Sequence, residues 1–524
     1  MGQLLYPRGA EHMQNSRPNT VGRLIAITIL MVGLTFAVCY LRLFVFPNVP
    51  ILLLGDAIGL ENEGARIVAR QLLYRDFFEI LPPGTPYTYA LLVRTFGLRN
   101  WIPLAVMPCL AGTTALLMTL ASGRIMRGNV IALPALLFAG PILFRSADAT
   151  HHWFSTILVL TAMLILLGKN TILRIAAAGA CCGAAACFTQ TKGAMAVVGF
   201  VTYLIWKSWR ENSRVRDAWL NCLLLCGAAV AVFAAVNLYF IATAGLNRWF
   251  YCLVVYPLRY YPAPALNNWR VVKLEFHAQQ STAGWIAFLF VYCTVPLVYI
   301  VFLLVMRRQW WKDRSYPWDQ LLLIAVTGIA MFLAIAQSPS IKRLSTVSPP
   351  AMILLAWFLD KPTRVFAVVK MTLATVATAL AVTAAVHSQT RPKTYLYLPA
   401  GRTAFTDNAV REEYRWVLTH THPAQFFWGM PPLYVPFHLQ NPAPTESLDT
   451  SEYTRPEEIA AVLRALQQHN VPIIILPSEG QYPLTINSPS NHAMAFVAYL
   501  HANYRLTSTF ATGDEVWEKV GSIP

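Results

Sequence analysis

Residues 24–46 read LIAITILMVGLTFAVCYLRLFVF and contain one charged residue, Arg42. This stretch is longer than the roughly 20 apolar residues that a helix needs to cross a bilayer. Arg8, Arg17 and Arg23 precede it, and no small-residue cleavage site follows it. We therefore expect an uncleaved membrane anchor whose basic tail lies in the cytoplasm.

Ten further apolar stretches follow this anchor, each of roughly 16–25 residues, which is the length of a membrane-spanning helix. They begin near Trp101, Val130, Trp153, Ile172, Ala194, Ala218, Trp285, Trp318, Leu344 and Val365. The sequence therefore predicts a mainly α-helical, polytopic membrane protein with a bundle of about eleven spans.

The composition agrees with a membrane protein. The 524 residues are 56% hydrophobic and 13% charged, with a mean hydropathy of +0.47, whereas about a quarter of the residues of a soluble domain are charged. This excludes an ordinary soluble enzyme, a disordered chain and a coiled coil. Eight of the nine cysteines lie in apolar stretches and the ninth, Cys252, stands alone in a loop. Their spacing favours neither a disulfide framework nor a thiolate zinc site.

The charges predict the orientation of the chain. Lys+Arg number 41 and Asp+Glu 25, and the basic residues gather in the tail and in alternate connections, as the positive-inside rule requires. These connections hold Arg124, Arg127, Lys169, Arg174, Lys207, Arg210, Arg214, Arg216, Arg307, Arg308, Lys312, Arg314, Lys361, Arg364 and Lys370. The basic excess therefore needs no nucleic-acid partner. An odd number of spans places the C-terminus outside.

The chain changes character near Thr390, after which prolines are frequent and cysteines are absent. Helical periodicity appears over 411–418 and 456–469, and short strands are expected over 424–428, 471–476 and 505–510. We predict a transmembrane domain over 1–389 and a small extracytoplasmic α/β domain over 390–524.

The first outer loop, residues 47–100, is acidic. Asp56, Glu61 and Glu63 lie within eight residues, and the stretch Tyr74-Arg75-Asp76-Phe77-Phe78-Glu79 and the turn Pro82-Pro83-Gly84 follow them. We expect interfacial helices over 65–73 and 88–96. A carboxylate here is a candidate general base. The alternative is a loop whose charges only keep it in water.

A second group of ionisable residues precedes the span that begins at Trp153. Arg145, Asp148, His151 and His152 lie at an outer helix end, close to hydrocarbon, where such groups are costly and commonly functional. Adjacent histidines on a helix diverge by about 100°, so one histidine with Asp148 is the more credible metal site. Anchoring at the membrane interface is the alternative.

Basic residues also occur in outer connections, against the positive-inside trend. Lys192 and Arg343 lie in two short connections, and Arg259 lies among Tyr256, Tyr260 and Tyr261. Their charges favour an anionic partner such as a phosphate. The alternative is that their side chains reach lipid headgroups.

Taken in order, these motifs resemble the GT-C superfamily of integral-membrane glycosyltransferases, in particular its bacterial branch of protein mannosyltransferases and aminoarabinose lipid A transferases. The resemblance implies a polyprenyl-phosphate sugar donor, a lipid, glycan or protein acceptor, and transfer on the outer face with inversion. Because this branch is bacterial, the resemblance also implies that the outer face is the periplasmic face of an inner membrane. By resemblance, Asp56 matches the catalytic aspartate of the first loop, Asp148 a second acid, and Lys192 and Arg343 the ligands of the donor phosphate. The usual Asp-Glu pair is absent because Ala57 follows Asp56, which leaves Glu61 or Glu63 as substitutes. Some relatives use a divalent metal.

Two other functions remain open from the sequence. A polysaccharide polymerase or ligase also uses polyprenyl-linked sugars, and a lipid or solute transporter also has many spans. No Walker, dinucleotide-binding, HExxH or GxSxG motif is present, which argues against an ATP-driven pump, a dinucleotide enzyme and a serine hydrolase.

Overall fold

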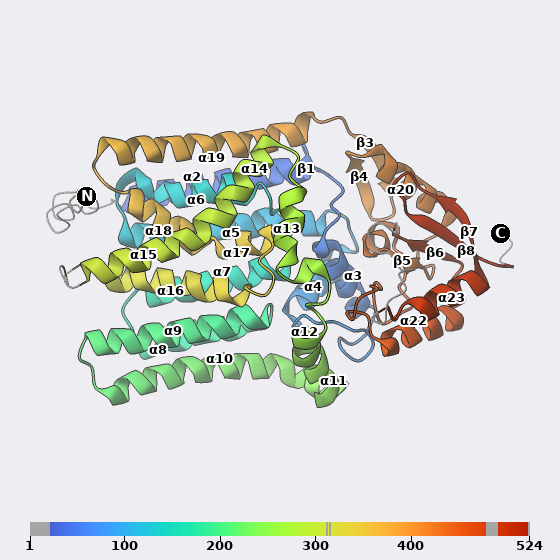
Figure 1. Ribbon diagram of the computed structural model, residues 1–524, viewed down its shortest axis with the longest axis horizontal. Helices are drawn as coiled ribbons and strands as arrows, with labels where there is room; N and C mark the ends of the chain where they lie inside the picture. Colours follow the sequence, from blue (N-terminus) through green and yellow to red (C-terminus); the bar gives the residue numbers. More distant parts are fainter. Residues whose placement is uncertain (1–20, 311–312, 314–315, 478–490, 522–524) are drawn as a thin grey trace.

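The computed structural model describes residues 21–310, 313, 316–477 and 491–521. A bundle of long helices forms one end of an elongated molecule, and a smaller part containing the C-terminal strands forms the other (Figure 1). The outer connections of the bundle lie between these two parts.

The bundle contains a helix wherever the sequence predicts a span. Its helical segments are α2 (Val21–Leu43), α5 (Ile102–Ile125), Gly128–Ile142 with α6 (Leu133–Leu137), α7 (His151–Leu166), α8 (Ile172–Ala186), α9 (Gln190–Arg210), α10 (Val215–Ala244), Thr282–Gln309 with α14 (Thr282–Leu289) and α15 (Val295–Gln309), α16 (Trp318–Ala334), α17 (Ile341–Val347), α18 (Pro349–Leu359) and α19 (Arg364–Thr390).

Five helices of the described part of the chain are long and apolar enough to cross a membrane: α2, α5, α10, the α14–α15 segment and α19. Gly128–Ile142, α7, α8, α16 and α18 are apolar but shorter. The protein is therefore a mainly helical integral membrane protein, as predicted, and the number of about eleven spans stays a prediction.

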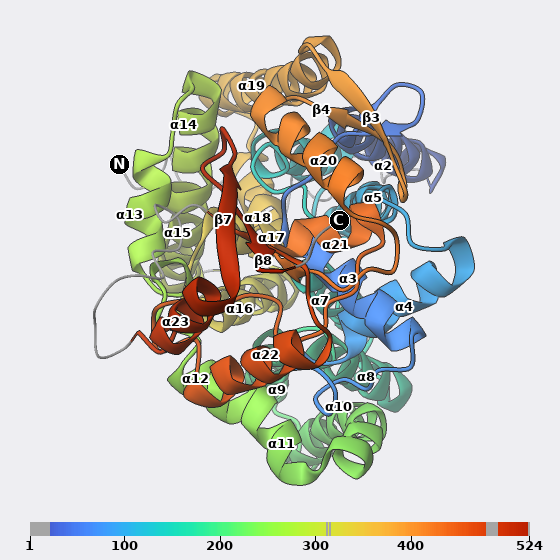
Figure 2. The same cartoon turned by 90° about the vertical axis from the view of Figure 1, so that its right-hand side faces the viewer.

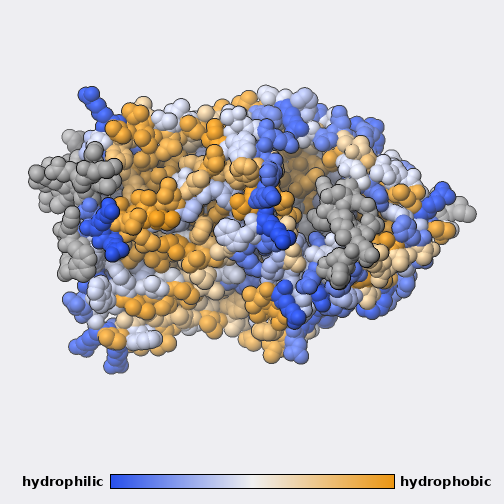
Figure 3. Space-filling view, viewed as in Figure 1, coloured by the Kyte–Doolittle hydropathy of each residue, from blue (hydrophilic) through white to orange (hydrophobic). Residues whose placement is uncertain are grey.

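The surface of the bundle is apolar, as a surface in contact with lipid should be. Ile29, Leu173 and Val368 are among its exposed large side chains, and apolar residues cover much of the bundle face in Figure 3. Inside, bulky side chains such as Trp153, Phe200 and Trp318 are fully buried. Helix α8 packs closely on α10 because Gly179 and Gly183 face the backbone of α10.

The first outer loop forms two helices, α3 (Asp56–Val68) and α4 (Gly84–Phe96). The second covers the expected residues 88–96 and begins earlier. The expectation for 65–73 was wrong, because the helix starts at Asp56 and ends before Arg70, whose φ of 68° is left-handed. A hairpin of β1 (Phe44–Val45) and β2 (Val49–Pro50) precedes α3, and α11 (Leu246–Phe250), α12 (Tyr256–Arg259) and α13 (Arg270–His277) form the long connection after α10.

Strands and helices alternate in the C-terminal residues. They are β3 (Thr394–Leu398), β4 (Gly401–Phe405), α20 (Asn408–His420), β5 (Trp428–Gly429), α21 (Tyr434–Phe437), α22 (Pro456–Gln468), β6 (Ile473–Leu476), α23 (Met494–Asn503), β7 (Tyr504–Thr509) and β8 (Glu515–Lys519). Helices α20 and α22 and strands β5, β6 and β7 overlap or adjoin the expected elements. That these residues form a separate domain stays a prediction.

These C-terminal strands form two sheets. Strands β3 and β4 make an antiparallel hairpin, and the other sheet has the order β5-β6-β8-β7, with β5 and β6 parallel and the remaining pairs antiparallel. Trp428, Leu466 and Phe496 are buried in the core on one side of this sheet. Figure 2 views the molecule from this end, with α22 and α23 beside the strands.

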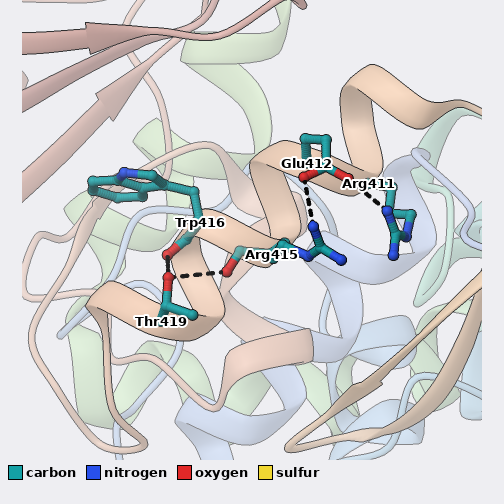
Figure 4. Close-up of polar contacts among 5 residues, drawn as sticks. All are labelled: Arg411, Glu412, Arg415, Trp416 and Thr419. Atoms are coloured by element: carbon teal, nitrogen blue, oxygen red, sulfur yellow. Dashed lines mark hydrogen bonds and ion pairs between the residues drawn. The ribbon is translucent and has the colours of Figure 1, made fainter.

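Helix α20 carries ion pairs on its surface. Glu412 contacts Arg411 at 2.5 Å and Arg415 at 3.2 Å, and the Thr419 hydroxyl donates to the carbonyl oxygens of Arg415 and Trp416 (Figure 4). Exposed pairs of this kind each contribute about 0–1 kcal/mol to stability.

Candidate active site

A cavity of about 610 Å³ lies between the first outer loop and the C-terminal residues. Its near wall includes Asp56, Glu63 and Glu79 of the first loop, with His151 at the start of α7 and Tyr261 after α12. Its far wall comes from residues 428–432, 446–448, 453 and 475–477. A cavity of this size can hold a small-molecule substrate.

Asp56 lies at this wall and Asp148 lies directly beside it, at the start of α3. Asp56 is exposed and begins α3, whereas Asp148 is 5% exposed. The Asp148 carboxylate accepts hydrogen bonds from the backbone N–H groups of Asp56, at 3.0 Å, and Ala57, at 3.2 Å. Gly55, the residue before the helix, offers no side chain for this role. Asp148 therefore caps α3 from a distant part of the chain.

Gly55 lets Asp148 approach the helix start. A Cβ at this position would lie 2.5 Å from Asp148 Oδ2, so only glycine leaves room for the carboxylate. Burial and the neighbouring charge of Asp56 raise the pKa of Asp148, and Lys342 and the two N–H groups oppose that rise.

Two adjacent cations at the start of α17 lie behind this wall. Lys342 Nζ lies 3.5 Å from Asp148 Oδ2. The Arg343 guanidinium donates to the Ser338 carbonyl at 3.2 Å and to the Tyr261 hydroxyl. Because Tyr261 lines the cavity, Arg343 lies directly behind the wall. The predicted residue Arg343 is thus near Asp56 and Asp148.

The histidine pair lies close together. The ring centroids of His151 and His152 are 4.0 Å apart, although their positions on the helix differ by about 100°. Of the two, His151 lines the cavity.

Lys192 lies deeper, inside the bundle, and is 0% exposed. Its ammonium donates to the His152 carbonyl at 2.9 Å and to the hydroxyls of Thr156, at 3.0 Å, and Thr346, at 2.8 Å. These three bonds use every N–H of the group. Lys192 therefore joins α7, α9 and α17, and contact between Lys192 and a donor phosphate stays a prediction.

A group of carboxylates forms the other part of the cavity. Glu63, Glu79 and Glu446 line it together. Burial and the charges of Glu79 and Glu446 raise the pKa of Glu63, and burial raises the pKa of Glu446 to about 7. Glu446 accepts a 2.6 Å hydrogen bond from Asn62. Glu63 thus favours its protonated form, which can donate a hydrogen bond to a ligand.

Three predicted site residues lie away from the cavity. Glu61 is fully buried on the opposite side of α3 and accepts a bond from the Arg99 N–H at 3.3 Å. Arg259 is exposed and packs over the Tyr260 ring. Arg145 lies near Glu275 and Gly284. Glu61 does not line the cavity because its side chain lies on the other side of α3, which the sequence interpretation did not anticipate.

Four residues of the site were not among the predicted ones: Lys342, Tyr261, Glu79 and Glu446. Lys342 adjoins the predicted Arg343, Glu79 ends the acidic loop motif, and Tyr261 follows the predicted Arg259 by two residues. No sequence pattern marks Glu446, because its place in the site comes from a contact with Asn62, which is 384 residues away in the chain. No three His, Cys, Asp or Glu side chains among the described residues are arranged to hold a metal ion.

No protein-family model and no curated protein sequence matches this chain. Solved structures do. ArnT from Cupriavidus metallidurans bound to undecaprenyl phosphate aligns with a TM-score of 0.57 and 13% identity over 96% of this chain and 99% of that chain. Its apo structure aligns with a TM-score of 0.51 and 13% identity over 95% and 98%.

An oligosaccharyltransferase from Archaeoglobus fulgidus, in complex with Zn and sulfate, aligns with a TM-score of 0.52 and 14% identity over 94% of this chain and 73% of that chain. Both of these proteins are membrane glycosyltransferases with the GT-C fold. The chain therefore has the GT-C fold, as the sequence predicts.

Proposed function

We propose that this protein transfers a sugar from a polyprenyl-phosphate donor to an acceptor hydroxyl on the outer face of the membrane. The observation that supports it best is the exposed Asp56 carboxylate at the cavity wall with two cations behind that wall, where Lys342 contacts Asp148 and Arg343 donates to Tyr261. Similarity to ArnT bound to undecaprenyl phosphate supports the choice of donor. The proposal places the N-terminus in the cytoplasm and the C-terminal residues in the periplasm of a bacterial cell.

The proposed reaction exchanges one C–O bond for another. The acceptor oxygen attacks the anomeric carbon while Asp56 takes its proton, and the bond from that carbon to the donor phosphate oxygen breaks. Attack from the face opposite the phosphate inverts the anomeric configuration. Glu63, on the same wall, was the other candidate for the base, but its raised pKa keeps it protonated, so Asp56 is the proposed base. Glu61 drops out of this role because it does not line the cavity.

The leaving phosphate gains negative charge as its bond to the sugar breaks. Lys342 and Arg343, held at the N-terminal end of α17, are the groups proposed to stabilise that charge. His151 lines the same wall and Lys192 supports it from behind through the His152 carbonyl and Thr346. Asp148 contacts both Lys342 and the start of α3 and so holds them next to each other.

The test compares Asp56→Asn with the unchanged protein. Purified full-length chain in detergent is given radiolabelled undecaprenyl-phosphate pentoses and hexoses, with a membrane extract as the source of acceptors. We expect transfer of single sugars with release of undecaprenyl phosphate, and a loss of at least about 100-fold in D56N, the typical scale of general-base catalysis. The matched control is Asp217→Asn, which should keep full activity. Asp217 is an exposed aspartate in the first turn of α10, at the end of that helix farther from the cavity.

Three results would contradict the proposal. Undiminished transfer by D56N would reject Asp56 as the base. Growth of a chain rather than addition of one sugar would favour a polymerase or ligase, and movement of intact donor across liposomes without bond breakage would favour a transporter.

A further inference from the structure

Helix α13 lies in the long connection after α10, between the bundle and the C-terminal residues (Figure 1). It presents apolar side chains outward, with Leu274 and Phe276 exposed and Trp269, just before it, 62% exposed. Lys273 and His277 are exposed as well. Glu275, on the same helix, is partly buried and points toward the bundle, where it contacts α17.

Glu275 contacts two elements of the bundle. Its Oε2 atom accepts a hydrogen bond from the backbone N–H of Ile341 at 2.8 Å. The Tyr292 hydroxyl lies 2.7 Å from the same oxygen and 2.8 Å from the Pro339 carbonyl. Bonds to an ionised carboxylate are stronger than those between neutral groups. Glu275 therefore fixes both the turn before α17 and the first residue of that helix.

The residue that Glu275 holds directly precedes the two site cations. Ile341 is followed by Lys342, which reaches Asp148 at 3.5 Å, and by Arg343, which donates to Tyr261. The other cap of α17, the Ser340 hydroxyl, accepts from the Arg343 N–H at a longer 3.4 Å. Asp148 in turn holds the N–H groups at the start of α3. Two carboxylates thus connect α13, α17 and α3 in series.

We propose that Glu275 is a positioning residue for the donor phosphate site: it holds the first turn of α17 so that Lys342 and Arg343 face the cavity wall. This inference rests on the proposed function. Glu275 does not line the cavity and acts through the backbone of α17. Because a displaced cation loses charge-assisted hydrogen bonds to the phosphate, the loss of Glu275 should weaken phosphate binding strongly.

The first experiment measures binding of undecaprenyl phosphate, without a sugar, to the full-length protein in detergent by native mass spectrometry. We expect Glu275→Ala to weaken binding by about 10- to 100-fold, which is the scale of one lost hydrogen bond to a charged group. Glu275→Gln should restore most of it, because a Gln oxygen can still accept from Ile341 and Tyr292. Lys273→Ala, an exposed position on the same helix, is the control and should bind as the unchanged protein does.

The second experiment measures hydrogen exchange over residues 339–348 without any ligand. E275A should exchange faster there than the unchanged protein, while E275Q and K273A should not. Unchanged exchange in E275A would overturn the positioning role. So would undiminished lipid binding in E275A alongside weakened binding in Lys342→Ala.

The two experiments separate this inference from the proposed function. If the unchanged protein does not bind undecaprenyl phosphate, the proposed function fails, and exchange at α17 still decides whether Glu275 positions that helix. Elution of E275A as a monodisperse species, like E275Q, shows that its weaker binding does not come from unfolding.

Discussion

At the scale of single residues, the site shows that side chains close in sequence can have different surroundings. Glu61 and Glu63 are separated by one residue, yet Glu63 lines the cavity and Glu61 contacts the Arg99 N–H on the other side of α3. Two residues along a helix turn the side chain by about 200°. The sequence identified both carboxylates, but could not distinguish them because the expected helix began at Ala65 rather than Asp56.

Glu61 gives a prediction for the pH dependence of stability. Burial raises the pKa of Glu61 from 4.5 to about 8. Since the folded state then holds a proton that the unfolded state releases, the free energy of unfolding contributed by Glu61 falls as pH rises from about 4.5 to about 8. Glu61→Gln should remove this contribution, so its melting temperature in detergent should fall less between pH 5 and pH 8.

The control for this comparison is Glu412→Gln, which changes an exposed carboxylate of α20. Its melting temperature should fall between pH 5 and pH 8 by as much as that of the unchanged protein. We also expect E61Q to retain sugar transfer, because Glu61 does not face the cavity. An identical fall in melting temperature between pH 5 and pH 8 for E61Q and the unchanged protein would contradict the raised pKa of Glu61.

At the scale of elements, the sequence predicted the long helices best. Apolar runs mark α2, α10 and α19 because a span must be apolar along its whole length. The start of α3 was missed for a different reason: its cap is Asp148, 92 residues away. The short helix α17 before Pro349 was also not separated from α18, although proline at a helix start is a known signal.

The packing of α8 on α10 gives a second prediction. A Cβ at Gly179 or Gly183 would collide with the carbonyl oxygens of Leu225 and Ala229. Gly179→Ala and Gly183→Ala should each destabilise the bundle by roughly 1–3 kcal/mol, the cost of overpacking, and lower the melting temperature in detergent. Gly227→Ala on α10, where no atom lies within 4 Å of the added Cβ, should leave it unchanged. Equal melting temperatures for all three variants would contradict close packing at this contact.

At the scale of the whole molecule, the cavity depends on parts of the chain that no local pattern connects. The resemblance placed Asp56, Asp148, Lys192 and Arg343 on one membrane face. Asp148 does contact the start of α3 at Asp56, and Arg343 reaches the cavity wall through Tyr261, whereas Lys192 is buried inside the bundle. The far wall at Trp428, Glu446 and Tyr453 was not predicted. Those residues acquire a role only when the C-terminal residues fold over the first loop, and periodicity carries no information on such contacts.

The orientation of the molecule gives a third prediction. Tyr397 on β3 is 74% exposed and should face the outside, whereas Trp209, exposed near the end of α9, should face the cytoplasm. A membrane-impermeant maleimide should label Tyr397→Cys in intact cells, and should label Trp209→Cys only after permeabilisation. The unchanged protein, whose described cysteines lie mostly in apolar helices, is the background control. The opposite pattern would invert the topology.

The joint between the first loop and the C-terminal residues has a consequence for protein engineering. Asn62 contacts Glu446, Arg66 donates to the Ala443 carbonyl at 3.0 Å, and the Phe78 N–H donates to the Pro444 carbonyl at 2.9 Å. A chimaera that takes only the first loop or only the C-terminal residues from a homologue would bring together two surfaces whose side chains do not fit each other. Segments 47–100 and 428–477 should therefore be exchanged together, as one inherited unit.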